Sequence, residues 1–154
     1  MKLTILGSGS PEAYTRRAST GYLLEVGKDR ILFDCGGGVV DNLIRSGRLP
    51  KDITHLFFTH YHSDHMMDYA RLVHAAWDEG GAPIKVFGPK PLKDITEGHF
   101  GRNGVLSHDL RARTELTQSQ RDCCINRVLT CRIDHIACSH ATAAKRLLIN
   151  AISP

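Results

Sequence analysis

This chain of 154 residues lacks several features that would mark a specialised protein. No apolar stretch approaches the roughly 18 residues that a membrane-spanning helix needs. The N-terminal apolar segment is too short for a signal peptide, so we expect a cytoplasmic protein with no membrane partner. No long run of Lys or Arg exists, and the few aromatic residues do not interleave with basic ones. A dedicated nucleic-acid groove is therefore not readable from the sequence.

The residues that are present are typical of one soluble globular domain. Hydrophobic residues make up 42% of the chain and charged residues 23%, and the length fits a single domain over residues 1–154. Lys and Arg total 20 against 16 Asp and Glu, and the resulting charge of +4 permits an anionic substrate such as a phosphodiester without requiring one.

Cysteine is uneven along the chain. Five cysteines are an odd number, and in a cytoplasmic protein we expect thiols. Four of them crowd near the C-terminus: Cys123, Cys124, Cys131 and Cys138. They lack the Cys-x-x-Cys pairs of common structural zinc sites, so buried thiols are favoured over a metal site.

Strand-like and helix-like segments alternate, which predicts an α/β fold. The expected strands are 2–6, 20–26, 30–33, 55–59 and 84–87. The spacing of apolar residues predicts helices over 39–45 and 64–78. Loop and helix are expected over 88–125, and further strands over 127–133 and 146–152.

The most informative segment carries His60, His62, Asp64 and His65 directly after an apolar strand and before an amphipathic helix. Imidazole and carboxylate ligands suit a borderline cation such as zinc. Four ligands this close in the chain cannot all bind one ion without strain. We therefore expect two adjacent ions, with His60 and His62 on one and Asp64 and His65 on the other. The context disfavours a plain histidine-rich surface turn.

This segment resembles the signature of the metallo-β-lactamase-fold hydrolases. Other segments resemble the ribonuclease Z and arylsulfatase-like branch of that family, in the same order: 6–11 with 16–19, 32–36, 86–89 and 133–135. The resemblance covers roughly residues 1–135. It implies a metallo-β-lactamase-like αββα sandwich, of which this chain holds the first half and part of the second.

The resemblance also implies the site residues. The first zinc site would be His60, His62 and His135, and the second would include Asp64 and His65, with Asp64 assigned to catalysis as well. Asp34 would brace the motif loop by hydrogen bonds; the alternative is an aspartate that merely forms a turn before glycines. The implied activity is a zinc-dependent hydrolysis in which a metal-bound hydroxide attacks a phosphodiester, in a small molecule or in RNA.

The chain also departs from the family pattern. The family's second site uses an aspartate from a Gly-Asp strand, whereas residues 136–154 contain no Asp or Glu, and His140 matches no family position. We therefore expect a domain that is incomplete at its C-terminus, weakly active or inactive, and prone to self-association through its C-terminal strand. The alternatives are a catalytically deficient remnant that holds one ion at most, or a hydrolase of lactones, thioesters or sulfate esters.

Overall fold

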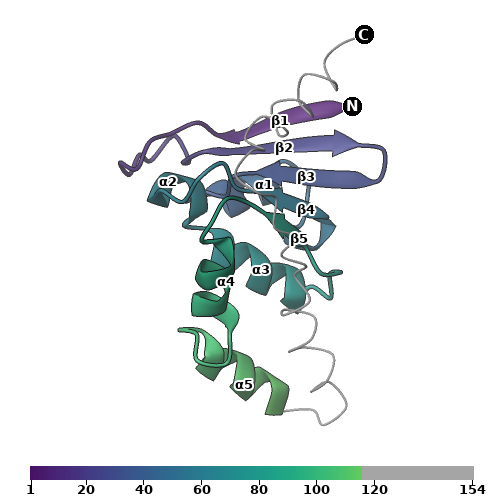
Figure 1. Ribbon diagram of the computed structural model, residues 1–154. Helices are drawn as coiled ribbons and strands as arrows, with labels where there is room; N and C mark the ends of the chain where they lie inside the picture. The colour runs from purple at the N-terminus through teal and green to yellow at the C-terminus, as the bar shows by residue number, and fades with distance from the viewer. Residues whose placement is uncertain (116–154) are drawn as a thin grey trace.

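The computed structural model describes residues 1–115, which form a five-stranded sheet and its helices (Figure 1). The strands are β1 (Lys2–Gly7), β2 (Gly21–Val26), β3 (Asp29–Phe33), β4 (His55–Phe57) and β5 (Lys85–Phe87). The helices are α1 (Val39–Arg45), α2 (Ser63–Met66), α3 (Tyr69–Asp78), α4 (Leu92–Phe100) and α5 (Ser107–Glu115), with a 3₁₀ turn at Pro50–Asp52. The expected α/β character is confirmed. The strands expected over 127–133 and 146–152, the clustered cysteines, His135 and the C-terminal association surface lie outside the described residues.

The strands lie in the order β1–β2–β3–β4–β5. β1 and β3 each pair antiparallel with β2, whereas β3, β4 and β5 run parallel. The carboxyl ends of β1, β3, β4 and β5 therefore meet at one edge of the sheet. In open α/β sheets, ligand sites form outside this edge.

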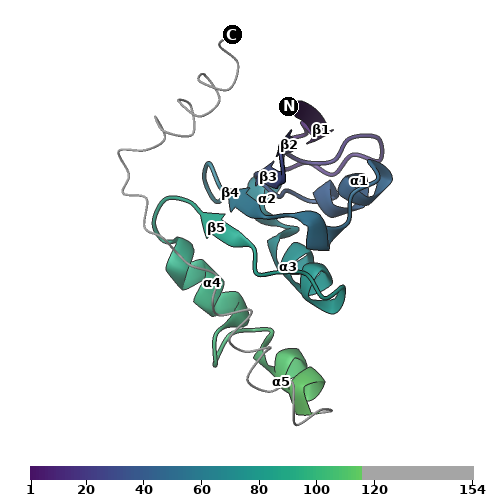
Figure 2. The same ribbon diagram turned by 90° about the vertical axis from the view of Figure 1, so that its right-hand side faces the viewer.

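One face of the sheet packs against α1 and α3, as Figure 2 shows. Apolar strand residues meet helix residues there in one buried cluster that includes Leu23, Leu32, Leu56, Val39, Leu43 and Leu72. On the other face, the rings of Phe33, Phe57 and Phe87 stack in a row, with centroid distances of 5.5 and 4.6 Å. Apolar side chains on both faces are typical of a sheet that lies between two layers.

The helix expected over 64–78 is in fact two helices, α2 and α3. The carbonyl oxygens of Asp64 and His65 accept hydrogen bonds from the amides of Thr20 and Cys35, at 2.9 and 2.7 Å. The Asp68 amide in turn donates to the Cys35 carbonyl. These tertiary hydrogen bonds replace bonds that a continuous helix would make, so the helix breaks between Met66 and Tyr69.

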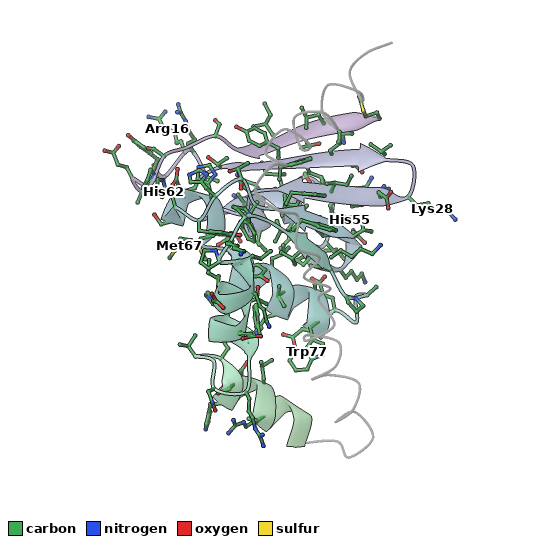
Figure 3. All side chains as sticks on the ribbon, in the orientation of Figure 1. Arg16, Lys28, His55, His62, Met67 and Trp77 are labelled. Carbon is green, nitrogen blue, oxygen red and sulfur yellow. The ribbon has the colours of Figure 1, made fainter. Side chains whose placement is uncertain are left out.

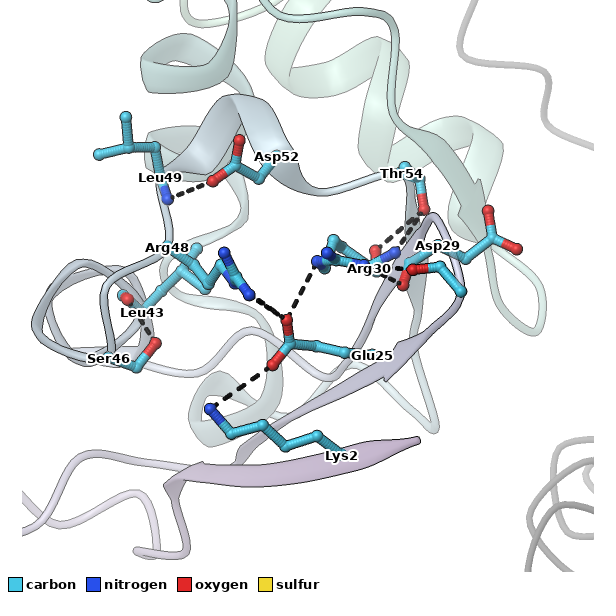
Figure 4. Close-up of polar contacts among 11 residues, drawn as sticks. Lys2, Glu25, Asp29, Arg30, Leu43, Ser46, Arg48, Leu49, Asp52 and Thr54 are labelled. Atoms are coloured by element: carbon cyan, nitrogen blue, oxygen red, sulfur yellow. Dashed lines mark hydrogen bonds and ion pairs between the residues drawn. The ribbon is translucent and has the colours of Figure 1, made fainter.

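Glu25 connects three strands and the loop after α1 (Figure 4). Its carboxylate, which is 8% exposed, forms ion pairs with Lys2 on β1, Arg30 on β3 and Arg48. Burial by itself would raise the pKa of Glu25. The hydrogen bond and charge of Arg48, together with the charges of Lys2 and Arg30, outweigh this effect and lower the pKa.

Two further expectations can be compared with the structure. Cys35 is a buried, free thiol, as expected, and burial raises its pKa well above the ordinary value. Within residues 1–115, no helix has the length and the apolar character needed to cross a membrane.

Candidate metal centre

The motif histidines lie at the edge where the parallel strands end. Asp34 follows β3, the segment from Thr59 to His65 follows β4, and Pro89 follows β5. The strand expected over 55–59 ends at Phe57. The Phe58 amide still donates to the Phe87 carbonyl on β5, but the Thr59 amide turns to the Asp34 carboxylate, so regular pairing stops there.

Asp34 is the polar centre beneath the motif. Its side chain is 2% exposed, and its backbone has a φ of 56°, a conformation that Asp and Asn tolerate better than most residues. Oδ1 accepts a hydrogen bond from the Thr59 amide at 2.8 Å, and Oδ2 accepts one from the Thr59 hydroxyl at 2.8 Å. His65 Nδ1 lies 2.9 Å from the same Oδ2. Asp34 therefore makes the hydrogen bonds expected of a residue that braces the motif.

These hydrogen bonds select a tautomer for two imidazoles. An ionised carboxylate only accepts, so His65 Nδ1 carries a proton, and Nε2, which lies 3.3 Å from Asp64 Oδ2, is the nitrogen left for a metal. The Thr59 hydroxyl gives its proton to Asp34 and can then only accept from His60 Nδ1, at 2.9 Å. His60 Nε2 therefore also presents a lone pair. Neutral imidazoles held in one tautomer by a second group are typical of metal ligands.

The three motif imidazoles lie together. The ring centroids of His60 and His65 are 3.9 Å apart, and those of His60 and His62 are 4.6 Å apart. His62 is exposed, and both His62 and Arg16 are labelled in Figure 3; the adjacent Ser63 lines one groove with Arg16. The structure thus brings together the three histidines that the motif predicted.

Asp64 completes the cluster from the first turn of α2. It is 9% exposed, and its Oδ2 lies 3.3 Å from His65 Nε2. Its Oδ1 is buried and has no hydrogen-bond partner among the described residues. A buried oxygen without a partner is costly, and a cation bound between Asp64 and His65 would satisfy it. The donors present therefore fit a zinc ion.

The cluster offers each expected ion only part of its ligands. In residues 1–115, no three histidine, cysteine, aspartate or glutamate side chains are grouped so that they could hold one metal ion. A division into two pairs, His60 with His62 and Asp64 with His65, implies that further ligands come from elsewhere. His135, the third ligand predicted for the first ion, lies outside the described residues.

A groove of about 500 Å³ opens beside Asp64. It lies between the loop of residues 11–19 and α1, and its cationic lining residues are Arg16, Arg17 and Arg45. Asp41 also lines it, but both carboxylate oxygens of Asp41 accept hydrogen bonds from Arg71, which lower the pKa of Asp41. Glu12 and Asp64 line the groove as well, so it places three guanidinium groups among three carboxylates, one of which is paired with Arg71.

Sequence reasoning missed two residues of this centre. Thr59 links Asp34 to His60 through its hydroxyl, and Tyr61 donates a hydrogen bond to the Pro89 carbonyl from within the motif. Burial raises the pKa of Tyr61 to about 12, so its hydroxyl stays protonated. The position of each beside a motif histidine was the only signal, because their partners come from other strands.

Gly36 explains how α2 approaches the sheet so closely. A Cβ at this position would lie 1.9 Å from the Asp64 carbonyl oxygen. The glycines after Asp34 therefore include one that serves close packing, which is the interpretation that the sequence favoured over a phosphate cradle.

Comparison with known proteins identifies the family to which the motif belongs. The family profile described as the metallo-beta-lactamase superfamily matches residues 14–113, more than half of the chain. Ribonuclease Z of Mycolicibacterium gilvum is 33% identical over 101 residues, which are 63% of this chain and 35% of that protein. Ribonuclease Z of Crocosphaera subtropica is 37% identical over 119 residues, 72% of this chain and 37% of that protein. The chain thus spans about a third of the length of these curated relatives.

Solved structures lead to the same family. Human tRNase Z, short form, superposes with a TM-score of 0.57 at 32% identity, covering 62% of this chain and 36% of the human one. The metallo-beta-lactamase fold protein YhfI from Bacillus subtilis superposes with a TM-score of 0.55 at 24% identity, over 62% of this chain and 39% of YhfI, and shows the fold alone. The chain therefore belongs to the metallo-β-lactamase superfamily and has its fold.

Proposed function

We propose that this chain carries the metal-binding half of a zinc-dependent hydrolase of the ribonuclease Z type, which cleaves phosphodiesters in RNA. One observation carries the proposal. The motif donors are gathered at the sheet edge, with His65 and, through Thr59, His60 oriented by the buried Asp34. The relatives named ribonuclease Z support this activity over others of the superfamily.

The motif residues, together with His135, would hold two zinc ions. His60 and His62 would bind the first ion together with His135, and Asp64 and His65 would bind the second. Bound zinc supplies Lewis acidity, which lowers the pKa of water toward about 7 and stabilises charge on a phosphoryl oxygen. Asp34 accepts from His65 Nδ1, and the Thr59 hydroxyl accepts from His60 Nδ1, which leaves Nε2 of each ring as the nitrogen available to a metal.

The groove beside Asp64 supports a phosphodiester substrate over a neutral lactone. Guanidinium groups form charge-assisted hydrogen bonds with phosphate oxygens, and Arg16, Arg17 and Arg45 line the groove. The Asp41 carboxylate would not strongly repel such a substrate, because Arg71 neutralises it.

The proposal is tested by measuring zinc and turnover on the purified 154-residue chain. We expect bound zinc and at most weak cleavage of a 3′-extended tRNA precursor, which stops when zinc is chelated and returns when zinc is restored, and we expect loss of both in His60→Ala. His55→Ala is the matched control, because His55 lies on β4, just before the motif, and is not a predicted ligand. Unchanged zinc binding in His60→Ala would contradict the assignment.

 The His55 ring belongs to β4, and its Nδ1 lies 2.8 Å from the Thr54 hydroxyl, away from the motif. Its replacement therefore removes an imidazole without touching a predicted ligand. A loss of zinc in His55→Ala as large as that in His60→Ala would show a general effect on folding, and would count against a specific site.

The second candidate is a metal-binding remnant without turnover. It is favoured by the fact that residues 1–115 offer each ion only a pair of ligands, and that residues 136–154 contain no Asp or Glu. Zinc stoichiometry separates the candidates: near two ions per chain supports the hydrolase, and near one or none supports the remnant. A parallel assay of lactone and thioester hydrolysis tests whether the substrate class is wrong.

A further inference from the structure

Tyr61 lies between two predicted ligands and points away from them. Side chains alternate along extended backbone, so His60 and His62 share one side and Tyr61 takes the other. The structure agrees: the rings of His60 and His62 lie 4.6 Å apart, whereas the Tyr61 ring packs against the hydrophobic core, 5.7 Å from that of Phe58. Tyr61 therefore holds the segment from His60 to His62 on the side that faces the hydrophobic core.

The hydroxyl of Tyr61 reaches the loop between β5 and α4. It donates a hydrogen bond to the Pro89 carbonyl oxygen. Gly88 leaves the space for this contact, because a Cβ at that position would lie 2.6 Å from the Tyr61 hydroxyl oxygen. Just before it, the Phe58 amide donates to the Phe87 carbonyl at 2.8 Å. The motif is thus attached to the end of β5 by a backbone bond and a side-chain bond.

We propose that Tyr61 is a positioning residue for the His60 and His62 pair, anchored at Pro89 through the opening at Gly88. The proposal rests on the proposed function, since it takes both histidines as ligands of one ion. Metal geometry tolerates errors of only about 0.2 Å in ligand distances. Asp34 holds the segment at Thr59, and α2 begins at Ser63. Tyr61 supplies the anchor between these two points.

The first test compares Tyr61→Phe with Tyr69→Phe in the full chain. Each variant loses one tyrosine hydroxyl that makes a hydrogen bond, to the Pro89 carbonyl for Tyr61 and to the Thr96 hydroxyl, at 3.0 Å, for Tyr69. We expect zinc affinity, measured by competition with a chromophoric chelator, to fall about tenfold or more in Tyr61→Phe. We expect it to stay within about twofold of wild type in Tyr69→Phe. Equal affinities in the two variants would overturn the proposal.

The second test uses Gly88→Ala, whose methyl group would collide with the Tyr61 hydroxyl. In Tyr61→Phe that oxygen is gone, and the nearest remaining atoms to the methyl are the Phe58 Cβ at 3.2 Å and the ring carbon Cζ of residue 61 at 3.5 Å. Gly88→Ala should therefore weaken zinc binding in the wild-type background and add little to Tyr61→Phe. Losses that simply multiply in the double variant would contradict the shared anchor.

A third measurement needs no metal. The Phe58 and His65 amides donate to the Phe87 and His62 carbonyls, on either side of Tyr61. Their hydrogen exchange in the metal-free chain should be faster in Tyr61→Phe than in wild type, and unchanged in Tyr69→Phe. Exchange that is unaltered by Tyr61→Phe would show that the hydroxyl does not hold the segment. If the wild-type chain bound no zinc, the proposed function would fail, and exchange would still decide whether Tyr61 is the anchor.

Discussion

Replacing Asp34 with Asn should separate the orientation of the ligands from the backbone conformation that Asp34 adopts. Asn tolerates the φ of 56° about as well as Asp, so the turn keeps its shape. The amide still offers an oxygen to the Thr59 backbone N–H, but its nitrogen replaces the carboxylate oxygen that faces His65 Nδ1. A donor now meets a donor at that contact.

The His65 ring can restore a hydrogen bond only by moving its proton to Nε2. That tautomer has no lone pair at the atom assigned to the metal. Loss of a hydrogen bond to a charged group costs about 1.5–3 kcal/mol of folding stability, and replacement of such an outer partner lowers metal affinity about 10- to 100-fold. We expect Asp34→Asn to lower the free energy of unfolding by about 1.5–3 kcal/mol and the zinc affinity by about 10- to 100-fold.

Urea denaturation measures the stability, chelator competition measures zinc affinity, and the nitrogen chemical shifts of the imidazoles report the tautomer. Asp29→Asn is the control, because Asp29 opens β3 at the far end of the same strand and is exposed. A variant at Asp34 that binds zinc as tightly as wild type, with the proton of His65 still on Nδ1, would refute the reasoning.

Three further predictions concern packing, charge and the second ion. Gly36→Ala should lower the free energy of unfolding by about 1–3 kcal/mol, because its Cβ would lie 1.9 Å from the Asp64 carbonyl oxygen. The control is Gly98→Ala, whose Cβ would meet no atom within 4 Å, and it should raise the free energy of unfolding by about 0.5–1 kcal/mol. Urea denaturation measures both. Glu25 has a lowered pKa in the fold, so it stabilises the fold above the unfolded value of about 4.3, and this contribution is lost as the pH falls through the folded value. Denaturation of Glu25→Gln should therefore be less dependent on pH in that window than denaturation of wild type. Asp64→Ala should weaken the second zinc ion more than the first in a calorimetric titration, and an equal loss of both would contradict the division into two pairs.

Much of the fold follows from local sequence patterns. Apolar residues at the i and i+4 positions predicted α1 with its observed bounds, and short apolar runs between turn residues predicted every strand of the sheet to within two residues. These signals are local, since a helix stripe or a strand alternation is complete within its own segment. The grouping of His60, His62 and His65 was predictable for the same reason, because they are close neighbours in the chain.

The sequence by itself could not predict contacts between distant segments. The expected helix over 64–78 breaks because Thr20 and Cys35 take the carbonyl oxygens of α2, and neither partner is near α2 in the chain. Likewise, only the parallel pairing of β3, β4 and β5 brings Asp34 beneath Thr59 and Pro89 beside Tyr61. Residue types and spacing determined which atoms could bind a metal. The tertiary structure decided which nitrogen of His60 and His65 is presented, because Asp34, which follows another strand, bonds to His65 directly and to His60 through Thr59.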